Sequence, residues 1–89
     1  MTFVVRTPNG VVAQGECEFV VVPTTRGEMG VLADHAPVVA AVAPGQLRVT
    51  AGAHETRIGV GAGLVDVLDN VVGLFVVDAG SGGAAGSAG

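Results

Sequence analysis

The 89 residues make one small domain, and a chain of this size buries only about 60% of its unfolded surface, so its stability would be marginal unless a partner adds to it. Nineteen valines, with no tryptophan or tyrosine, favour β-strands, because branching at Cβ suits an extended backbone. The chain has eight acidic residues, four arginines and no lysine. The absence of lysine excludes lysine-modified carrier domains and P-loop sites, and the net negative charge argues against a nucleic-acid partner.

Turn signals divide the start of the chain into short strands. Thr7-Pro8-Asn9-Gly10 has proline second and glycine fourth, as in a tight turn. We expect strands at residues 2–6, 11–14 and 18–22, with Gly15 breaking the pairing of the second and Pro23 ending the third.

Residues 26–45 follow no plain strand pattern. Gly27 and Gly30 bracket Glu28 and Met29, which predicts a tight turn that holds a carboxylate beside an exposed thioether. Such a loop is either a recognition point for a partner or a solvated loop without one. The residues alone leave both interpretations open.

The second half of this stretch returns to strand. Asp34 and His35 precede Pro37, which pushes the chain into an extended conformation, and Pro44-Gly45 is a turn signal. We therefore predict a displayed surface loop followed by a strand that anchors it.

Four further strands follow in the second half of the chain. They are expected at residues 46–50, 56–60, 64–68 and 71–77. Residues 51–55 form a turn, and Asp69-Asn70 a two-residue reversal. The run 71–77 is nearly continuous in apolar residues, which predicts a strand covered on both faces. The fold class is thus all-β, a small sandwich or barrel, with no segment of helical periodicity.

The composition changes after Asp78. Residues 79–89 contain only glycine, alanine and serine. We predict a folded domain over residues 1–78 and a flexible tail over 79–89 that can be deleted without loss of stability.

No motif assembles a catalytic, cofactor or metal site. The run from Gly59 to Gly63 lacks the G-x-G-x-x-G spacing and precedes a strand, so it predicts a bend or bulge and no phosphate site. Cys17 could serve as a nucleophile only beside His35, and a buried thiol is the favoured interpretation. His35 and His54 have no metal-ligand spacing. The lone cysteine forms no internal disulfide and suits a reducing compartment.

Membrane and targeting signals are not expected either. The longest apolar run, residues 38–43, is far shorter than the roughly 20 residues that span a bilayer. The first residues show no charged segment with a cleavage pattern, so we expect no targeting peptide.

The order of short motifs resembles one family. Gly27-Glu28-Met29-Gly30-Val31, His35-Ala36-Pro37 and Pro44-Gly45 are similar to the GELGI…GHAPLLTALKPG signature of the epsilon subunit of F-type ATP synthases. Further matching segments are Thr7-Pro8-Asn9-Gly10 with Gly15-Glu16, and residues 18–23, 58–67 and 70–72. Two departures are Asp34, where the family has glycine, and Gly61-Ala62-Gly63 in place of Ser-Gly-Gly.

The resemblance, which covers residues 3–78, implies a β-sandwich of about ten strands in two sheets. It implies a non-catalytic subunit of the central stalk that binds the gamma subunit and the polar loops of the c ring, on the cytoplasmic face of the bacterial inner membrane. Membrane contact would come only through the complex, with no cofactor and no small-molecule ligand. The alternative is a small β-sandwich adaptor unrelated to ATP synthase.

The resemblance also assigns partner-binding residues. Glu28, Met29 and Gly30 fall in the loop that faces the c ring, and Asp34 and His35 in the segment near gamma. The family usually continues into a two-helix domain with inhibitory and ATP-sensing activity. This chain has the Gly/Ala/Ser stretch there, so we expect those activities to be absent.

Overall fold

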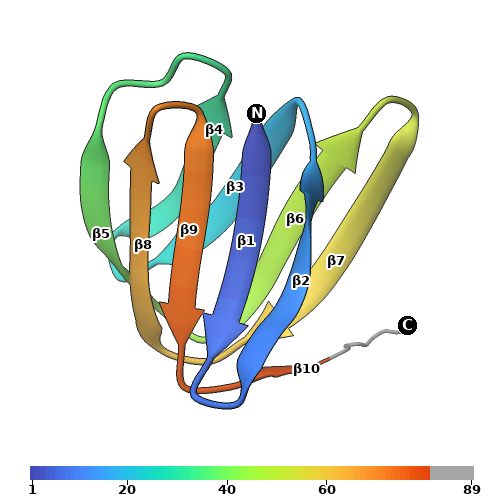
Figure 1. Ribbon diagram of the computed structural model, residues 1–89. Helices are drawn as coiled ribbons and strands as arrows, with labels where there is room; N and C mark the ends of the chain where they lie inside the picture. The colour runs from blue at the N-terminus through green and yellow to red at the C-terminus, as the bar shows by residue number, and fades with distance from the viewer. Residues whose placement is uncertain (81–89) are drawn as a thin grey trace.

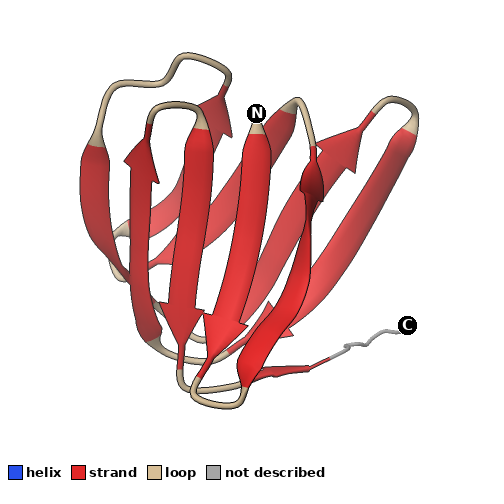
Figure 2. Ribbon diagram, in the orientation of Figure 1, coloured by secondary structure: helices blue, strands red, loops and turns tan. Residues whose placement is uncertain are grey.

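A computed structural model describes residues 1–80, and residues 81–89 lie outside the described part. Every element in residues 1–80 is a strand (Figures 1 and 2). The strands are β1 (Thr2–Thr7), β2 (Gly10–Glu16), β3 (Phe19–Thr24), β4 (Gly27–Leu32), β5 (Val38–Val42), β6 (Gly45–Ala51), β7 (His54–Val60), β8 (Gly63–Leu68), β9 (Val71–Val76) and β10 (Ala79–Gly80). The predicted all-β fold is confirmed. None of these elements is a helix that could span a membrane.

The strands form two layers that meet at one corner. β5, β8, β9, β1 and β2 make the front layer of Figure 1, and β4, β3, β6 and β7 lie behind it. The layers join where Thr24 of β3 lies opposite Val42 of β5. The flanking residues make the two backbone hydrogen bonds, from the Thr25 N–H to the Ala41 carbonyl and from the Ala43 N–H to the Pro23 carbonyl. Neighbouring strands run antiparallel except β1 and β9, which are parallel. The fold is a small β-sandwich.

The core between the layers is built mostly from valine. Alternate residues of each strand point inward, as the two-residue period of a strand requires. The residues that are less than 2% exposed are Leu47, Leu74, Val5, Val20, Val22, Val31, Val42, Val65, Val72 and Val76. Phe3 is the one aromatic side chain in this buried cluster. A core of such small side chains buries little apolar area per residue.

Two hairpins use residues that tolerate positive φ. Leu68 pairs with Val71, so the β8–β9 turn consists of Asp69 and Asn70 alone, with φ of 51° and 63°. Two positive φ values define a type I′ turn, which matches the twist of the flanking strands. The predicted two-residue reversal is therefore confirmed. The β6–β7 turn is tighter than the predicted residues 51–55, because Ala51 already pairs with His54.

Gly15 does not interrupt β2, contrary to the sequence prediction. It pairs with Phe3 of β1, and the pairing continues to Glu16. A Cβ at Gly15 would lie 3.4 Å from the Phe3 ring, which is van der Waals contact, so the glycine packs beside that ring. It does not break the strand.

The prediction that residues 71–77 are covered on both faces is also wrong. In β9 the side chains of Val72, Leu74 and Val76 are buried, whereas Val71 and Phe75 point out of the front layer. No strand of residues 1–80 lies over that outer face, which is turned toward the viewer in Figure 1. The second cover that the apolar run indicates is not supplied by this part of the chain.

Within the run from Gly59 to Gly63, Gly61 and Ala62 form the predicted bend between β7 and β8, while Gly59 and Val60 end β7 and Gly63 begins β8. A Cβ at Gly63 would lie 2.0 Å from the Phe75 carbonyl oxygen, so only glycine fits there. β10 begins at Ala79, which pairs with Val60, so strand structure extends two residues past the predicted boundary at Asp78. Its anchor is the Gly61 N–H, which donates to the Asp78 carbonyl at 2.9 Å. The rest of the predicted tail lies outside the described residues.

Candidate partner-binding surfaces

The five residues predicted to bind partners do not form one cluster. Glu28, Met29 and Gly30 lie in β4, and Asp34 and His35 lie in the connection that follows it. Glu28 sits next to the β3–β4 turn, whereas the β4–β5 connection runs along the other end of the sandwich, beside the β8–β9 turn (Figure 1). The strand from Glu28 to Leu32 alone separates the two ends by about 13 Å. The candidate residues thus belong to two surfaces.

The structure has its tight turn at Thr24 to Gly27, three residues before the predicted turn at Gly27 to Gly30. Thr24 pairs with Gly27, and the turn is closed by Thr24 Oγ1, which donates to the Gly27 carbonyl at 2.5 Å and accepts from the Arg26 N–H at 3.2 Å. Gly27 has φ of 106° and needs to be glycine. Gly30 is extended and pairs with Val21.

Gly30 and Met29 serve packing more than display. A Cβ at Gly30 would lie 3.2 Å from the Phe19 ring, so this glycine accommodates an aromatic side chain. Met29 is half-buried and packs against the core, which corrects the expectation of an exposed thioether. Only Glu28 of this group points a functional group into solvent.

Glu28 already has an ionic partner within the chain. Its Oε1 accepts a hydrogen bond from Arg48 Nη2 at 3.1 Å, and the Glu28 side chain is 63% exposed. Arg48 lies opposite Arg57 on β7, which pairs with Glu55 at 3.0 Å. The outer face of the rear layer therefore carries a short row of two acids and two arginines with no net charge.

An open groove lies beside this end of β4. It has a volume of about 640 Å³ and separates the β3–β4 hairpin from the edge of β5. Its lining includes Arg26, Glu28 and Val39. The groove is accessible to a polar loop of a partner.

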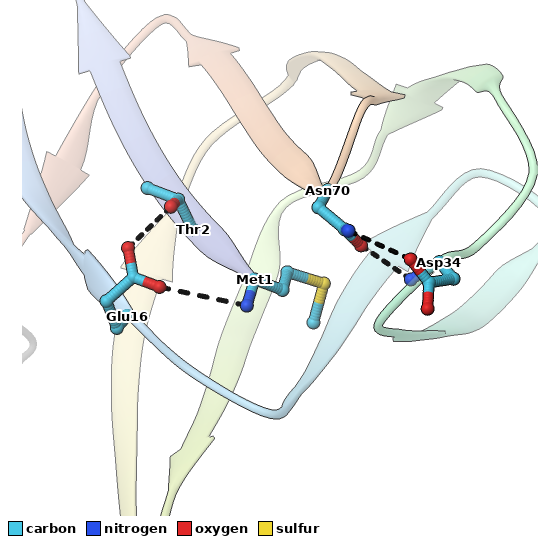
Figure 3. Close-up of polar contacts among 5 residues, drawn as sticks. All are labelled: Met1, Thr2, Glu16, Asp34 and Asn70. Carbon is cyan, nitrogen blue, oxygen red and sulfur yellow. Dashed lines mark hydrogen bonds and ion pairs between the residues drawn. The ribbon is translucent and has the colours of Figure 1, made fainter.

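Asp34 and His35 are fixed at the opposite end of the sandwich. Asp34 has φ of 63°, the left-handed conformation that glycine adopts without strain. Asn70 accepts a hydrogen bond from the Asp34 N–H at 2.5 Å, and its Nδ2 donates to Asp34 Oδ1 at 2.9 Å (Figure 3). The His35 N–H donates to the Leu32 carbonyl at 3.2 Å, and its Nδ1 lies 2.6 Å from the Ala36 carbonyl.

Further polar contacts hold the same end together. Thr2 Oγ1 donates to Glu16 Oε2 at 2.6 Å, and the Met1 amino group lies 3.8 Å from Glu16 Oε1 (Figure 3). The Thr2 N–H donates to the Asn70 carbonyl at 2.9 Å. The start of β1 is thereby tied to both β2 and the β8–β9 turn.

The residues considered for catalysis do not assemble a catalytic site. Cys17 is 3% exposed, and its burial raises the pKa of the thiol, helped by the nearby carboxylates of Glu16 and Glu18. A raised pKa keeps the thiol protonated and unreactive near neutral pH. Within residues 1–80 no three metal-ligating side chains gather. The buried-thiol interpretation therefore agrees with the structure.

The outer face of the front layer is apolar, and sequence analysis missed it as a site. The exposed side chains are Val39 (70%), Leu64 (57%), Phe75 (57%), Leu68 (53%) and Val71 (42%). Leu64 pairs with Phe75 and Leu68 with Val71, so they lie side by side on β8 and β9. The sequence does contain a signal for it, because β9 has apolar residues at both odd and even positions. Sequence analysis took this pattern to mean that both faces of the strand are buried.

A hollow of about 360 Å³ opens in this apolar face. Its floor includes Gly73, where the missing side chain leaves space, and the Asp66 carboxylate lies over it, 2.7 Å from where a Cβ would be. Val39, Phe75 and Arg6 line its sides. Val39 also lines the groove beside β4, so the two surfaces are continuous. We call the exposed residues Val39, Leu64, Leu68, Val71 and Phe75 the front apolar face.

A small β-sandwich whose accessible sheet face is apolar defines a protein-binding domain. The family described as "ATP synthase, Delta/Epsilon chain, beta-sandwich domain" matches residues 1–81, and the chain belongs to that family. The epsilon resemblance identified in the sequence is confirmed, and the alternative of an unrelated adaptor is excluded.

Individual relatives agree with this family. The chain is 45% identical over 71 residues to the ATP synthase epsilon chain of Rhodopseudomonas palustris (strain TIE-1), across 80% of this chain and 51% of the relative. It is 38% identical over 76 residues to that of Desulfitobacterium hafniense (strain DSM 10664 / DCB-2), across 83% and 58%. The chain thus spans just over half the length of these relatives.

Solved structures share the fold. A chain in the Euglena gracilis mitochondrial ATP synthase, a structure of OSCP, F1 and c-ring, superposes with a TM-score of 0.79 at 31% identity, across 88% of this chain and 51% of that one. A chain from the Tetrahymena thermophila mitochondrial ATP synthase central stalk and c-ring superposes with a TM-score of 0.74 at 18% identity, across 90% and 65%. The second likeness shows the fold alone.

Proposed function

We propose that this chain is a non-catalytic rotor subunit in the central stalk of an F-type ATP synthase. In this role it clamps the gamma subunit to the c ring, so that rotation of the ring driven by proton flow reaches the sites of ATP synthesis. Membership of the Delta/Epsilon family and likeness to a chain in an F1 and c-ring structure support the proposal. The contribution is mechanical and needs no cofactor or small-molecule ligand of its own.

The observation that carries the proposal is the front apolar face. Scattered apolar residues are normal on a protein surface, but a contiguous patch indicates an interface. Leu64 and Phe75 are paired neighbours with more than half of each side chain exposed, and the hollow above Gly73 lies beside them. We propose that gamma covers this face and adds the apolar burial that a valine core of this size lacks.

The end near Glu28 suits the c ring. The groove between the β3–β4 hairpin and β5 presents Arg26 and Glu28 to a polar loop. Because Glu28 already pairs with Arg48, an arginine of the ring would share the carboxylate, and its contribution would be the about 0.2 to 1 kcal/mol of an exposed ion pair. In this arrangement Asp34 and His35, at the other end, lie near gamma.

The proposed assembly implies a location for the chain. As part of the complex it would lie peripherally on the cytoplasmic face of a bacterial inner membrane. Contact with the membrane would come only through the ring.

Co-purification with the gamma subunit from the same genome tests the proposal. The wild-type chain should be retained by tagged gamma. Leu64→Glu and Phe75→Glu should each weaken retention, because each replaces an apolar contact with a carboxylate, and the loss should be greater for Leu64→Glu because Arg6 lies beside Phe75 on β1. Gln46→Glu adds the same charge on exposed β6 of the rear layer and should bind as the wild type does. Loss of binding in the control alone, or no binding by the wild type, would overturn the proposal.

A further inference from the structure

One pair of side chains fixes the β4–β5 connection to the β8–β9 turn. Asp34 and Asn70 are 36 residues apart and exchange two hydrogen bonds, of 2.5 Å and 2.9 Å (Figure 3). The first uses the Asp34 backbone N–H and the second its carboxylate. Because donors and acceptors match on both sides, the two chain segments are held in one relative position.

Asp34 has a backbone conformation that glycine would adopt more easily, so its side chain must contribute something else. The His35 N–H closes a turn on the Leu32 carbonyl, and Asp34 is its third residue, with φ of 63°. That position favours glycine or asparagine when φ is positive. A glycine would adopt the conformation freely but would have no carboxylate. Asp34 therefore accepts some backbone strain and gains a hydrogen bond to Asn70.

Asn70 extends the connection to a third segment. It is the third residue of the type I′ turn Leu68-Asp69-Asn70-Val71, and its carbonyl accepts the Thr2 N–H at 2.9 Å. The β4–β5 connection, the β8–β9 turn and the start of β1 therefore meet at this one residue. These are three chain segments far apart in the sequence.

We propose that Asp34 and Asn70 are positioning residues for partner binding. Their two hydrogen bonds hold His35 and the start of β5 in the partner-bound shape before the partner arrives. The proposal rests on the function proposed above, because it takes His35 and Val39 of β5 as parts of the gamma-facing surface. Prior ordering of a binding segment strengthens binding, since less conformational freedom is lost on association.

Asn70→Gly is the cleanest test, because it removes both hydrogen bonds and leaves an Asp-Gly turn, which type I′ geometry favours. Asn70→Asp is harsher, since it sets a second carboxylate against that of Asp34. Combining Asn70→Asp with Asp34→Asn restores the match, as the new amide donates to the new carboxylate. The double variant is therefore a rescue control for the single one.

Hydrogen exchange of the full chain reports the hydrogen bonds directly. In Asn70→Gly the amides of Asp34 and His35 should exchange about 30-fold faster, the effect of losing two ordinary hydrogen bonds. The Arg26 N–H, which donates to Thr24 Oγ1 in the β3–β4 turn at the opposite end, opens locally without breaking the Asp34–Asn70 pair and should exchange at an unchanged rate. Unchanged exchange at Asp34 would overturn the proposal.

Affinity for purified gamma gives the second readout. Asn70→Gly should bind several-fold more weakly, and the double variant should bind more tightly than Asn70→Asp. Faster exchange with unaltered affinity would overturn the positioning role, as would a double variant no better than Asn70→Asp. If wild-type gamma binding itself is absent, the proposed function fails, while the exchange rates still decide whether the two residues order the loop.

Discussion

Two neighbouring residues of β9 test whether this strand is buried on one face, as in the structure, or on both faces, as its hydrophobicity alone predicts. Leu74 is 1% exposed and Phe75 is 57% exposed, on opposite faces of the same strand. Leu74→Ala should cost about 3 kcal/mol, within the usual range for a buried leucine, because a valine core cannot close over the cavity. Phe75→Ala should cost only about 1 kcal/mol, since less than half of a burial worth roughly 1.5 to 3 kcal/mol is lost.

Thermal and urea unfolding of the two variants measure this difference. For a domain of this size 1 kcal/mol shifts Tm by about 4 to 8 °C, so Leu74→Ala should melt about 12 to 24 °C lower and Phe75→Ala less than about 8 °C lower. If the strand were covered on both faces, the larger phenylalanine would be the more costly loss. A greater destabilisation by Phe75→Ala would refute the register of β9 and with it the front apolar face.

Three further predictions concern single positions. Gly63→Ala should destabilise by about 3 kcal/mol or more, seen as lost expression or a much lower Tm, because its Cβ would collide with the Phe75 carbonyl. The free energy of unfolding should fall as pH rises above about 8.5. In that range the Cys17 thiol ionises in the unfolded chain, whereas burial raises its pKa in the folded protein and keeps it protonated. Cys17→Ala should therefore lack this pH dependence. Glu28→Gln should lose only about 0.2 to 1 kcal/mol with its Arg48 pair, and a Tm loss above 10 °C would contradict an exposed pair.

Local signals predicted much of the fold. Valine-rich runs and turn residues predicted the strands. Asp69-Asn70 predicted the two-residue turn, because aspartate and asparagine tolerate positive φ whatever surrounds them. The errors at Gly15 and Gly30 have one physical reason. Both glycines pack beside a phenylalanine from a neighbouring strand, and no local pattern shows that contact.

The candidate site was harder to predict because it depends on distant contacts. The Asp34–Asn70 pair spans 36 positions, and the ion pair of Glu28 with Arg48 spans 20. The apolar excess of β9 was detected, but sequence alone could not tell whether this chain or a partner covers it. That distinction requires the arrangement of the layers.

Methyl NMR of the chain during titration with purified gamma tests the central claim most directly. The methyl signals of Val39 and Leu64 should shift or broaden at stoichiometric gamma, because they lie on the front apolar face. The methyls of Val21, which points out of the rear layer opposite Arg48, should stay unchanged and serve as the internal control. Perturbation of Val21 with no change at Val39 and Leu64 would contradict the account.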